Sequence, residues 1–204
     1  MSRSPRIGLF GGTFDPPHRA HLALAQVALQ TLALDELRWI PAGQPWQKAG
    51  RRLADAEHRC AMVQALFAGE PRFVLDCREL HRAGPSYTVD TARELVAERP
   101  GAELFLVIGQ DQYARFDTWR EWQALLGLVT LAVAAREGQA PRPPEALQGV
   151  AHRAQTLPLP TLRVSSTAAR AAAARGQALS ALTGAEVARY IEHHRLYRKE
   201  AAAH

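Results

Sequence analysis

Two histidines stand three residues apart in the stretch GGTFDPPHRAH, which occupies residues 11–21. A second polar stretch, VSSTAAR, occupies residues 164–170, near the other end of the chain. Histidine can bind a metal ion or donate a hydrogen bond, while hydroxyl and guanidinium groups suit phosphate oxygens. The residue types therefore leave three candidate ligands for the first stretch: a metal ion, a dinucleotide or a triphosphate.

The sequence lacks residues that a metal site or a dinucleotide site would need. A zinc site at His18 and His21 would need a third ligand, and no second cluster has suitable spacing. Cys60 and Cys77 belong to no CxxC pair, so we expect reduced thiols and no metal ligated by the protein. A dinucleotide would need GxGxxG, whereas the glycines at 11–12 are adjacent and the third is missing. The triphosphate interpretation remains, beside a simple capped helix whose histidines face solvent.

A triphosphate suits the stretch in three respects. Gly11 and Gly12 leave the backbone open to close approach at the end of a strand. The prolines at 16–17 set a rigid turn into a helix whose free N–H groups face the ligand. His18 and His21 lie one turn apart, so both imidazoles point from the same helix end. Each can donate to a phosphate oxygen, and more strongly if it is protonated.

The second stretch has two interpretations. Ser165, Ser166 and Thr167 are helix-capping types, and the alanines that follow favour a helix. The stretch can therefore be an ordinary capped helix on the surface. It can also be a second helix N-terminus aimed at phosphate, with Arg170 one turn inside it to grip phosphate oxygens in a bidentate way.

Both stretches resemble signatures of one family, the nucleotidylyltransferases related to class I aminoacyl-tRNA synthetases. GGTFDPPHRAH resembles GxFDPxHxGH, with Ala20 at the usual glycine, and VSSTAAR resembles ISSTxIR, with Ala169 at a larger apolar position. We expect a small shift in the fit of adenine at Ala20 and inward packing at Ala169. Two signatures in the family's order are far more specific than either alone. The resemblance implies that His18, His21 and Arg170 are catalytic.

The same resemblance implies an ATP site along both stretches and after the fourth predicted strand. Its expected members are Gly11, Gly12, Thr13, Phe14, His18, His21, Gly109, Asp111, Ser165, Ser166, Thr167 and Arg170. Asp111 would accept hydrogen bonds from ribose hydroxyls, as an acidic residue does in dinucleotide folds, unless it caps a helix.

Further likeness, to bacterial nicotinate-nucleotide adenylyltransferases, covers nearly the whole chain. Residues 85–96, PSYTVDTARELV, resemble their SYTxDT stretch, and residues 109–126 resemble their GxDxxxxxxxW segment. Residues 40–48, IPAGQPWQK, resemble their PxxxPxxK loop, with Trp46 where proline is frequent. Residues 182–197 resemble their closing helix. This likeness implies transfer of the adenylyl group of ATP to nicotinate mononucleotide.

The candidates for binding the acceptor mononucleotide are Asp15, Lys48, Tyr87, Thr88 and Trp119. The Trp119 indole can stack on a pyridine ring and add a cation–π term, although a core position would also explain it. Tyr87 and Thr88 stand at a loop-to-helix junction, where free N–H groups can receive a carboxylate. Lys48 would add positive charge near the acceptor phosphate, or is a solvated loop lysine. Asp15 would contact the reacting region through water or metal.

The implied reaction is a direct transfer in which the acceptor 5′-phosphate attacks the α-phosphorus of ATP and pyrophosphate leaves. A phosphate monoester is already ionised at neutral pH, so the site has to align two polyanions and stabilise charge. We expect Mg²⁺ to bridge the ATP phosphates with few protein ligands. Three alternatives remain: an adenylyltransferase for nicotinamide mononucleotide, one for phosphopantetheine, and a nucleotide-binding regulator without turnover.

The bulk composition excludes several other classes. The 204 residues are 47% hydrophobic and 22% charged, which is typical of a soluble globular protein. The net charge of +5 is spread along the chain, without the basic and aromatic pattern of a nucleic-acid binder. We see no membrane-spanning run and no signal peptide. We therefore expect a cytoplasmic monomer or homodimer that binds neither nucleic acid nor membrane.

The elements that must hold these residues alternate between strand and helix. Strands are predicted at residues 6–10, 37–40, 73–75, 104–108 and 128–134, with a short one ending at 164, and helices at 19–33, 55–67, 88–99, 118–126 and from 185. The order predicts an α/β fold: a doubly wound, Rossmann-like parallel sheet with helices on both faces and a small C-terminal helical segment. Residues 11–21 then lie at the carboxyl end of a strand, where such sheets bind ligands.

A single nucleotidylyltransferase domain is expected over residues 1–204. Its parts would be a core at 6–135, a Pro-rich linker at 138–149, and a C-terminal region at 160–198 that carries the second phosphate-binding stretch and the last helices.

Overall fold

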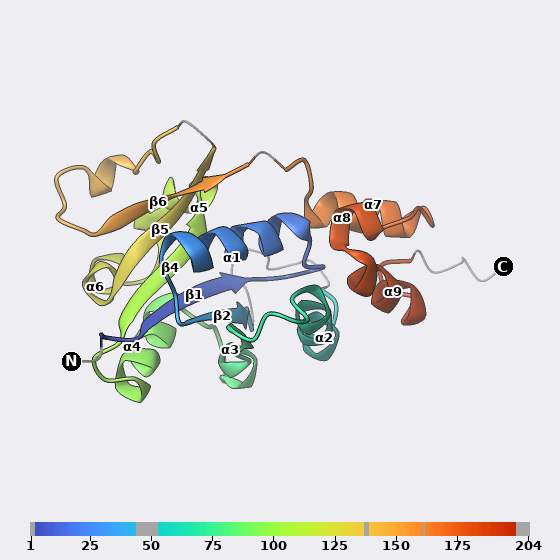
Figure 1. The fold of residues 1–204 in the computed structure, drawn as a ribbon, viewed down its shortest axis with the longest axis horizontal. Coiled ribbons are helices and arrows are strands. Elements are labelled where there is room, and N and C mark those ends of the chain that lie inside the picture. Colours follow the sequence, from blue (N-terminus) through green and yellow to red (C-terminus); the bar gives the residue numbers. More distant parts are fainter. Residues whose placement is uncertain (1–2, 44–52, 137–138, 161, 199–204) are drawn as a thin grey trace.

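The computed structural model describes residues 3–43, 53–136, 139–160 and 162–198, and its centre is a six-stranded parallel sheet (Figure 1). The strands are β1 (Arg6–Gly12), β2 (Glu36–Pro41), β3 (Phe73–Leu75), β4 (Glu103–Gly109), β5 (Val129–Arg136) and β6 (Ala154–Leu159). Their order in space is β3-β2-β1-β4-β5-β6, and every neighbouring pair is parallel. The doubly wound, Rossmann-like prediction is confirmed, and the strand order reverses between β1 and β4.

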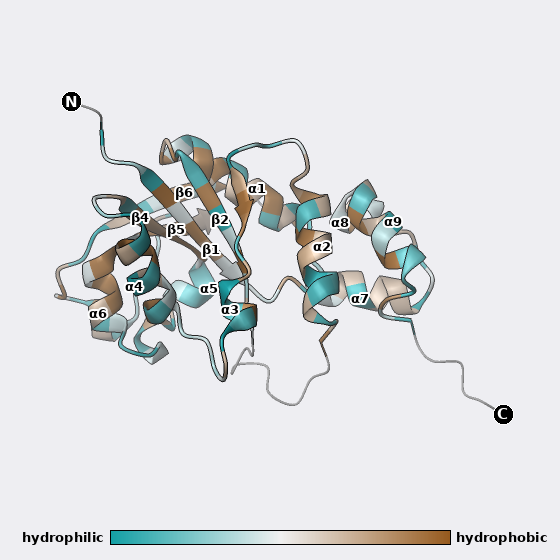
Figure 2. Cartoon of the chain, turned by 90° about the horizontal axis from the view of Figure 1, so that it is seen from below, coloured by the Kyte–Doolittle hydropathy of each residue, from teal (hydrophilic) through white to brown (hydrophobic). Residues whose placement is uncertain are grey.

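Helices cover both faces of this sheet. The helices of the described chain, including those that lie beyond the sheet, are α1 (Arg19–Thr31), α2 (Ala56–Leu66), α3 (Arg78–His81), α4 (Thr88–Glu98), α5 (Gln110–Tyr113), α6 (Trp122–Leu128), α7 (Ser166–Ala174), α8 (Ser180–Thr183) and α9 (Ala185–His193). α1 and α4 carry both apolar and polar residues (Figure 2) and bury apolar ones in the core, such as Leu24 and Leu29 of α1 and Leu95 of α4. No helix among the described residues is long and apolar enough to cross a membrane.

Alternation along the strands divides the core into two. Ile7 and Leu9 of β1 point to the face that α4 and α6 cover, and Phe10 points to the face that α1 and α2 cover. β4 repeats the pattern with Leu106 on the first face and Phe105 on the second. Because both faces are buried, the central strands are apolar at nearly every position.

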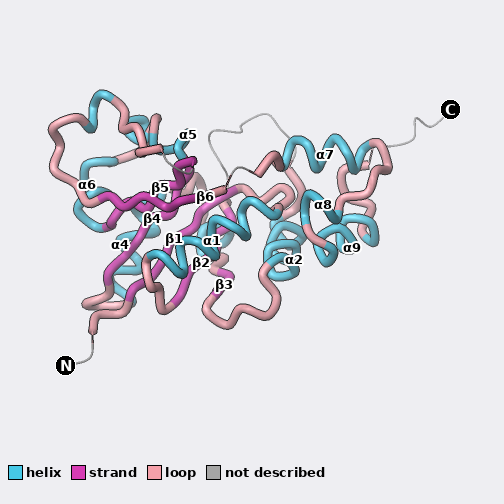
Figure 3. Tube along the Cα trace, turned by 45° about the horizontal axis from the view of Figure 1, so that its top comes forward, coloured by secondary structure: helices cyan, strands magenta, loops and turns pink. Residues whose placement is uncertain are grey.

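The C-terminal helices form a group of their own at one end of the molecule. α7, α8 and α9 lie together beyond the sheet, away from the N-terminus (Figures 1 and 3). α9 packs against α2 and α8, and Val187 and Ile191 of α9 belong to the same buried cluster as α1. The last helix predicted from residue 185 is confirmed.

Three predicted elements differ from the structure. Instead of one helix at 118–126, a 3-10 turn at Phe116–Thr118 precedes α6, because Glu121 takes a left-handed φ of 49° between them. The strand expected to end at 164 is β6, which ends at 159, so the sheet extends beyond the predicted core. Within the Pro-rich segment, Leu147 is buried and fixes the chain against the sheet.

Candidate active site

The loop after β1 is shaped by an inward-facing phenylalanine. Phe14 has a left-handed φ of 49°, and its ring is buried against Phe10 and Trp39. A Cβ at Gly12 would come within 2.8 Å of that ring, so only glycine fits there, while Gly11 faces open space. The side chain of Phe14 is part of the core, which leaves its backbone as the part that an ATP molecule could meet.

The two histidines lie together at the start of α1. His18 is the N-cap residue, and its ring stacks on that of His21 with centroids 3.6 Å apart. The His18 backbone N–H donates to His21 Nδ1 at 3.1 Å. A neutral His21 therefore carries its proton on Nε2, at the far side of the ring. Ala20, between them, is half-buried in the first turn.

Burial favours the neutral form of His18. The residue is 8% exposed, and desolvation lowers its pKa from 6.5 to about 4. Its Nδ1 is buried and has no hydrogen-bond partner among the described residues. The expected gain from protonation is thus not available to His18 at neutral pH in the free protein, and it donates as a neutral imidazole.

The second stretch forms the N-terminus of α7 and contacts the first stretch directly. Ser166 Oγ donates to the Pro16 carbonyl at 2.9 Å, and Arg170 Nη1 donates to the Asp15 carbonyl at 2.6 Å. Arg170 Nη2 also donates to Thr167 Oγ1 at 3.1 Å. Although about 150 residues separate them in sequence, the two stretches form one structure, which a simple surface helix would not do.

Ser165 has a local role. It is the N-cap of α7, and its Oγ accepts from the Ala168 backbone N–H at 3.1 Å. Ala169 is fully buried, so its expected inward packing is confirmed. The capped-helix interpretation therefore describes Ser165 correctly, while Ser166 and Arg170 tie the same helix to the loop after β1.

Asp15 is buried and bound within the protein. Its side chain is 1% exposed, and Oδ1 accepts from the Tyr197 hydroxyl at 2.7 Å and the Ala54 amide at 3.2 Å. A contact of this carboxylate with the acceptor stays a prediction, since the structure directs it toward α2 and the C-terminal segment. Lys48 and Trp46 lie outside the described residues.

A buried arginine that the sequence analysis did not identify supports the same loop. Arg59 of α2 is 3% exposed and donates to the carbonyls of Thr13, Ala42 and Ala54 at 3.0, 2.9 and 3.1 Å. Burial lowers its pKa, and the charge of Asp15 opposes that change. A signal did exist: Arg59 begins the apolar face of α2 that continues with Met62.

The end of β4 lies next to the loop after β1, at the point where the strand order reverses. Gly109 is the N-cap of α5, and a Cβ there would meet nothing within 4 Å. Asp111 follows in the first turn, is exposed and makes no capping bond, so the helix-cap alternative does not hold. Gln110 exchanges two hydrogen bonds with the Arg142 backbone, at 2.9 and 3.0 Å. Gln110, Asp111 and Arg142 line a cavity of about 420 Å³.

Three predicted acceptor residues lie together around the start of α4. Tyr87 is the N-cap of α4 and Thr88 its first residue. The Arg120 guanidinium stands 4.6 Å from the centre of the Tyr87 ring. Trp119 is half-buried and packs on Phe116, with centroids 5.2 Å apart. Its Nε1 is buried without a hydrogen-bond partner among the described residues. The contact with Phe116 fits the interpretation of Trp119 as a core residue. Its partly exposed surface allows stacking on a pyridine ring as well.

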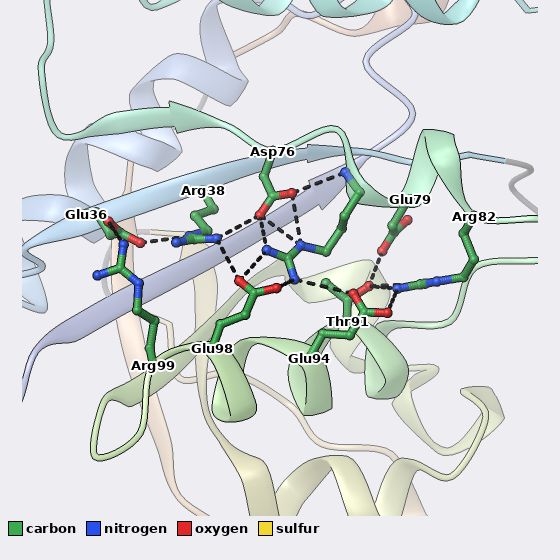
Figure 4. A network of polar contacts seen from close by, with 10 residues as sticks. Glu36, Arg38, Asp76, Glu79, Arg82, Thr91, Glu94, Glu98 and Arg99 are labelled. Atoms are coloured by element: carbon green, nitrogen blue, oxygen red, sulfur yellow. Dashed lines mark hydrogen bonds and ion pairs between the residues drawn. The ribbon is translucent and has the colours of Figure 1, made fainter.

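A network of charged residues fixes α4 and α3 against the edge of the sheet (Figure 4). It contains Glu36, Arg38, Asp76, Arg78, Glu79, Arg82, Thr91, Glu94, Glu98 and Arg99. Arg38 of β2 donates to Asp76 at 3.0 Å, and Arg78 binds both Asp76 and Glu98. Arg82 binds Glu94 at 2.6 Å, beside the loop that leads to Tyr87. The network therefore holds α4 through Thr91, Glu94 and Glu98.

Residues 9–172 match the family model described as cytidylyltransferase-like. The matched region begins in β1 and ends within α7, so it contains both stretches, residues 11–21 and 164–170, and the point between β1 and β4 where the strand order reverses. The chain therefore belongs to the cytidylyltransferase-like class of proteins.

Curated relatives narrow the class. A protein of Methylibium petroleiphilum named "Probable nicotinate-nucleotide adenylyltransferase" is 54% identical over 203 residues, covering 97% of this chain and 95% of the relative. A protein of the same name from Albidiferax ferrireducens is 46% identical, covering 95% of this chain and 98% of the relative. The chain belongs to the family of nicotinate-nucleotide adenylyltransferases.

Solved structures agree with the fold. The Plasmodium falciparum nicotinic acid mononucleotide adenylyltransferase complexed with NaAD matches with a TM-score of 0.79 at 18% identity, covering 95% of this chain and 97% of that one. A putative nicotinate-nucleotide adenylyltransferase from Vibrio parahaemolyticus matches with a TM-score of 0.68 at 20% identity, covering 96% of each chain. At these identities the likeness shows the fold.

Proposed function

We propose that the protein transfers the adenylyl group of ATP to nicotinate mononucleotide, giving nicotinate adenine dinucleotide and pyrophosphate, as the names of its relatives indicate. The observation that carries the proposal is the contact between the two phosphate-binding stretches. Arg170 reaches the Asp15 carbonyl and Ser166 the Pro16 carbonyl, so imidazole, hydroxyl and guanidinium donors gather beside one loop. A polyphosphate is the ligand that such a set of donors suits.

The nucleotide side works by hydrogen bonding and charge. His18 and His21 donate as imidazoles to oxygens of the triphosphate, and Arg170 supplies the positive charge that the neutral His18 does not. His21 presents its Nε2–H because His18 occupies its Nδ1. These donors stabilise the negative charge that gathers on the leaving pyrophosphate. The attacking phosphate is already ionised, so no residue has to act as a strong base.

Mg²⁺ enters this proposal together with ATP. Among the described residues, no three His, Cys, Asp or Glu side chains stand close enough to hold a metal ion together. Mg²⁺ would be held mainly through ATP, with few protein ligands. When bound, Mg²⁺ neutralises part of the phosphate charge, and the protein residues supply the orientation.

The acceptor side recognises a pyridine ring and its carboxylate. Trp119 offers part of its indole face for stacking and for a cation–π contact with the charged ring. Tyr87 and Thr88 open α4, whose N-terminal N–H groups can receive the nicotinate carboxylate. Asp111, exposed after β4, would accept from a ribose hydroxyl. A neutral nicotinamide would lose the interaction with the helix N-terminus, and this loss is the basis of the proposed selectivity.

An acceptor panel tests the proposal. Purified protein with ATP and Mg²⁺ would receive nicotinate mononucleotide, nicotinamide mononucleotide or phosphopantetheine, and pyrophosphate release would be measured. We expect the highest kcat/KM with nicotinate mononucleotide. Preference for another acceptor would select that alternative enzyme, and ATP binding without pyrophosphate release from any acceptor would indicate a regulator. Sedimentation and cell fractionation would test the proposed monomer or homodimer and its cytoplasmic location.

A further inference from the structure

The end of the described chain turns back to the loop that follows β1. After α9 ends at His193, Arg195 and Tyr197 take left-handed backbone angles, with φ of 53° and 63°. Such angles are unfavourable for residues other than glycine and persist where the surroundings hold them. The Tyr197 side chain points inward, and its hydroxyl donates to Asp15 Oδ1 at 2.7 Å. This bond spans 182 residues of sequence.

Asp15 connects Tyr197 with Arg170. The Asp15 carboxylate is buried and held by Tyr197 and by the Ala54 amide, and the Asp15 carbonyl accepts from Arg170 Nη1 at 2.6 Å. Because both acceptors belong to one residue of a tight loop, the anchors of the carboxylate also fix the direction of the carbonyl. Tyr197 can therefore influence the position of Arg170 through Asp15.

The Tyr197 hydroxyl is a permanent donor in this arrangement. Burial, and after it the negative charge of Asp15, raises the pKa of Tyr197 far above its ordinary value of 10.0. The hydroxyl therefore keeps its proton through the neutral pH range. It donates this proton to the Asp15 carboxylate and does not become a second negative charge beside it. The buried guanidinium of Arg59 adds positive charge near both groups, which offsets part of the cost of burying the carboxylate.

We infer that Tyr197 is a positioning residue for adenylyl transfer: by holding Asp15 it fixes the carbonyl that orients Arg170 at the phosphates. The inference rests on the proposed function, in which Arg170 supplies positive charge to the reacting phosphates. A displacement of such a group by about 1 Å can lower a rate on the order of a hundredfold. Loss of the hydroxyl should therefore reduce kcat while the ring keeps the fold.

The test compares Tyr197→Phe with Tyr190→Phe. Each variant loses one phenol hydroxyl from the C-terminal region, but Tyr190 OH bonds to His58 Nδ1 at 3.0 Å, between α9 and α2. The rate of pyrophosphate release, KM for both substrates and the thermal midpoint would be measured for each. We expect kcat of Tyr197→Phe to fall roughly tenfold, with a midpoint similar to that of Tyr190→Phe. Tyr190→Phe should keep the kcat of the unaltered protein.

Two results would overturn the positioning role: equal kcat in both variants, or a loss of kcat that only follows a loss of folded protein. A double variant with Asp15→Asn tests the route. If Tyr197 acts through Asp15, the two losses combine to less than their product.

The proposed function fails separately if the unaltered protein releases no pyrophosphate with any acceptor. Calorimetric titration with ATP then decides the inference. Weaker binding in Tyr197→Phe than in Tyr190→Phe supports the positioning of Arg170, and equal binding overturns it.

The two cysteines carry a second inference that is independent of the reaction. Cys60 lies on α2 and Cys77 directly precedes α3, and their sulfur atoms are 3.2 Å apart. Both thiols are free and half-buried, so small oxidants can reach them. A disulfide has an S–S distance of about 2.0 Å, so a small side-chain movement closes the bond. We propose that Cys60 and Cys77 form a reversible disulfide under peroxide.

The chemistry proceeds in two displacements. One of the two sulfurs attacks the peroxide and takes one oxygen as a sulfenic acid, and one water leaves. The other sulfur then attacks the sulfenic sulfur and releases the second water. In total the two thiols give up two protons and two electrons, and one hydrogen peroxide becomes two waters.

Peptide mapping tests this pair. Trypsin releases residues 60–72 and 73–78 as neighbouring peptides with one cysteine each. After treatment with hydrogen peroxide and digestion without reductant, we expect the two peptides to be linked and to separate with dithiothreitol. Cys77→Ser should give no linked product. Oxidation that stops at one oxygenated thiol, or that joins two chains, would overturn the proposal.

Discussion

The nucleotide side and the acceptor side of the site are built in different ways. On the nucleotide side, the loop after β1 is held by Arg59, Ser166, Arg170 and Tyr197, through bonds between distant parts of the chain. On the acceptor side, half-buried aromatic rings and more exposed charges surround the start of α4. The first arrangement fixes donors before any ligand arrives. The second offers surfaces that a ligand can complete, so changes there should affect binding more than turnover.

Arg170→Ala should give the largest effect. It removes the guanidinium that reaches the Asp15 carbonyl and, in the proposed reaction, the positive charge at the phosphates. We expect kcat to fall on the order of a hundredfold or more, as when a transition-state donor is removed elsewhere. Arg175→Ala is the matched control, because that arginine is the C-cap of the same helix and its side chain donates to Gln177. If Arg170→Ala and Arg175→Ala had equal kcat, Arg170 would not be a fixed donor, and the nucleotide side would no longer differ from the acceptor side in this respect.

The second largest effect concerns the pH dependence of stability. The pKa of His18 falls from 6.5 in the unfolded chain to about 4 in the folded protein. Between these values the unfolded chain binds the extra proton, so stability is complete above pH 6.5 and declines as the pH falls toward 4. The decline attributable to His18 is at most about 3 kcal/mol. Urea unfolding at several pH values would measure the free energy of unfolding, which should depend less on pH in His18→Gln than in the unaltered protein. An unchanged pH dependence would contradict the conclusion that His18 is buried in its neutral form.

Turnover gives a separate prediction for the same residue. His18→Ala should lower kcat at least about tenfold while the protein stays folded, because one phosphate donor is lost. Circular dichroism would check the fold and pyrophosphate release the rate. Near-normal turnover would exclude His18 from the chemistry.

Some contacts of the candidate site could be predicted from the sequence and others could not. The pairing of residues 11–21 with 164–170 was predicted, because both stretches have strong local signals and a known family order. Tyr197 was part of a recognised closing helix, but nothing local indicates that its hydroxyl meets Asp15. Contacts over such separations depend on tertiary packing, which periodicity does not contain.

The errors in the elements have local causes. Glu121 takes a left-handed backbone conformation that interrupts the helix expected at 118–126. Glutamate does not ordinarily mark such a position, so nothing in the sequence indicated the interruption. β6 is an edge strand with Pro158 and mostly exposed side chains, so it lacks the apolar run that identifies a central strand. α3 and α5 are single turns of helix, too short for a repeating pattern.

On the acceptor side, Trp119→Leu should raise the KM for nicotinate mononucleotide by roughly fivefold to tenfold and leave the KM for ATP nearly unchanged. Trp119→Phe keeps an aromatic face and should change the acceptor KM less. Trp122→Leu is the control, since Trp122 packs on the same core cluster from the start of α6. A similar rise in the ATP KM would show that Trp119 supports the whole site and not the acceptor alone.

The smallest effect is expected at the exposed ion pair between Arg93 of α4 and Glu121. The two side chains are 46% and 43% exposed, and their charged atoms are 2.5 Å apart. Water and salt screen such a pair, so Arg93→Ala should leave the urea midpoint within error and change the acceptor KM by less than about twofold. A larger rise in KM that disappears in high salt would reveal a preorganised acceptor side. Its ion pairs would then hold Trp119 and α4 together, much as buried bonds hold the loop after β1.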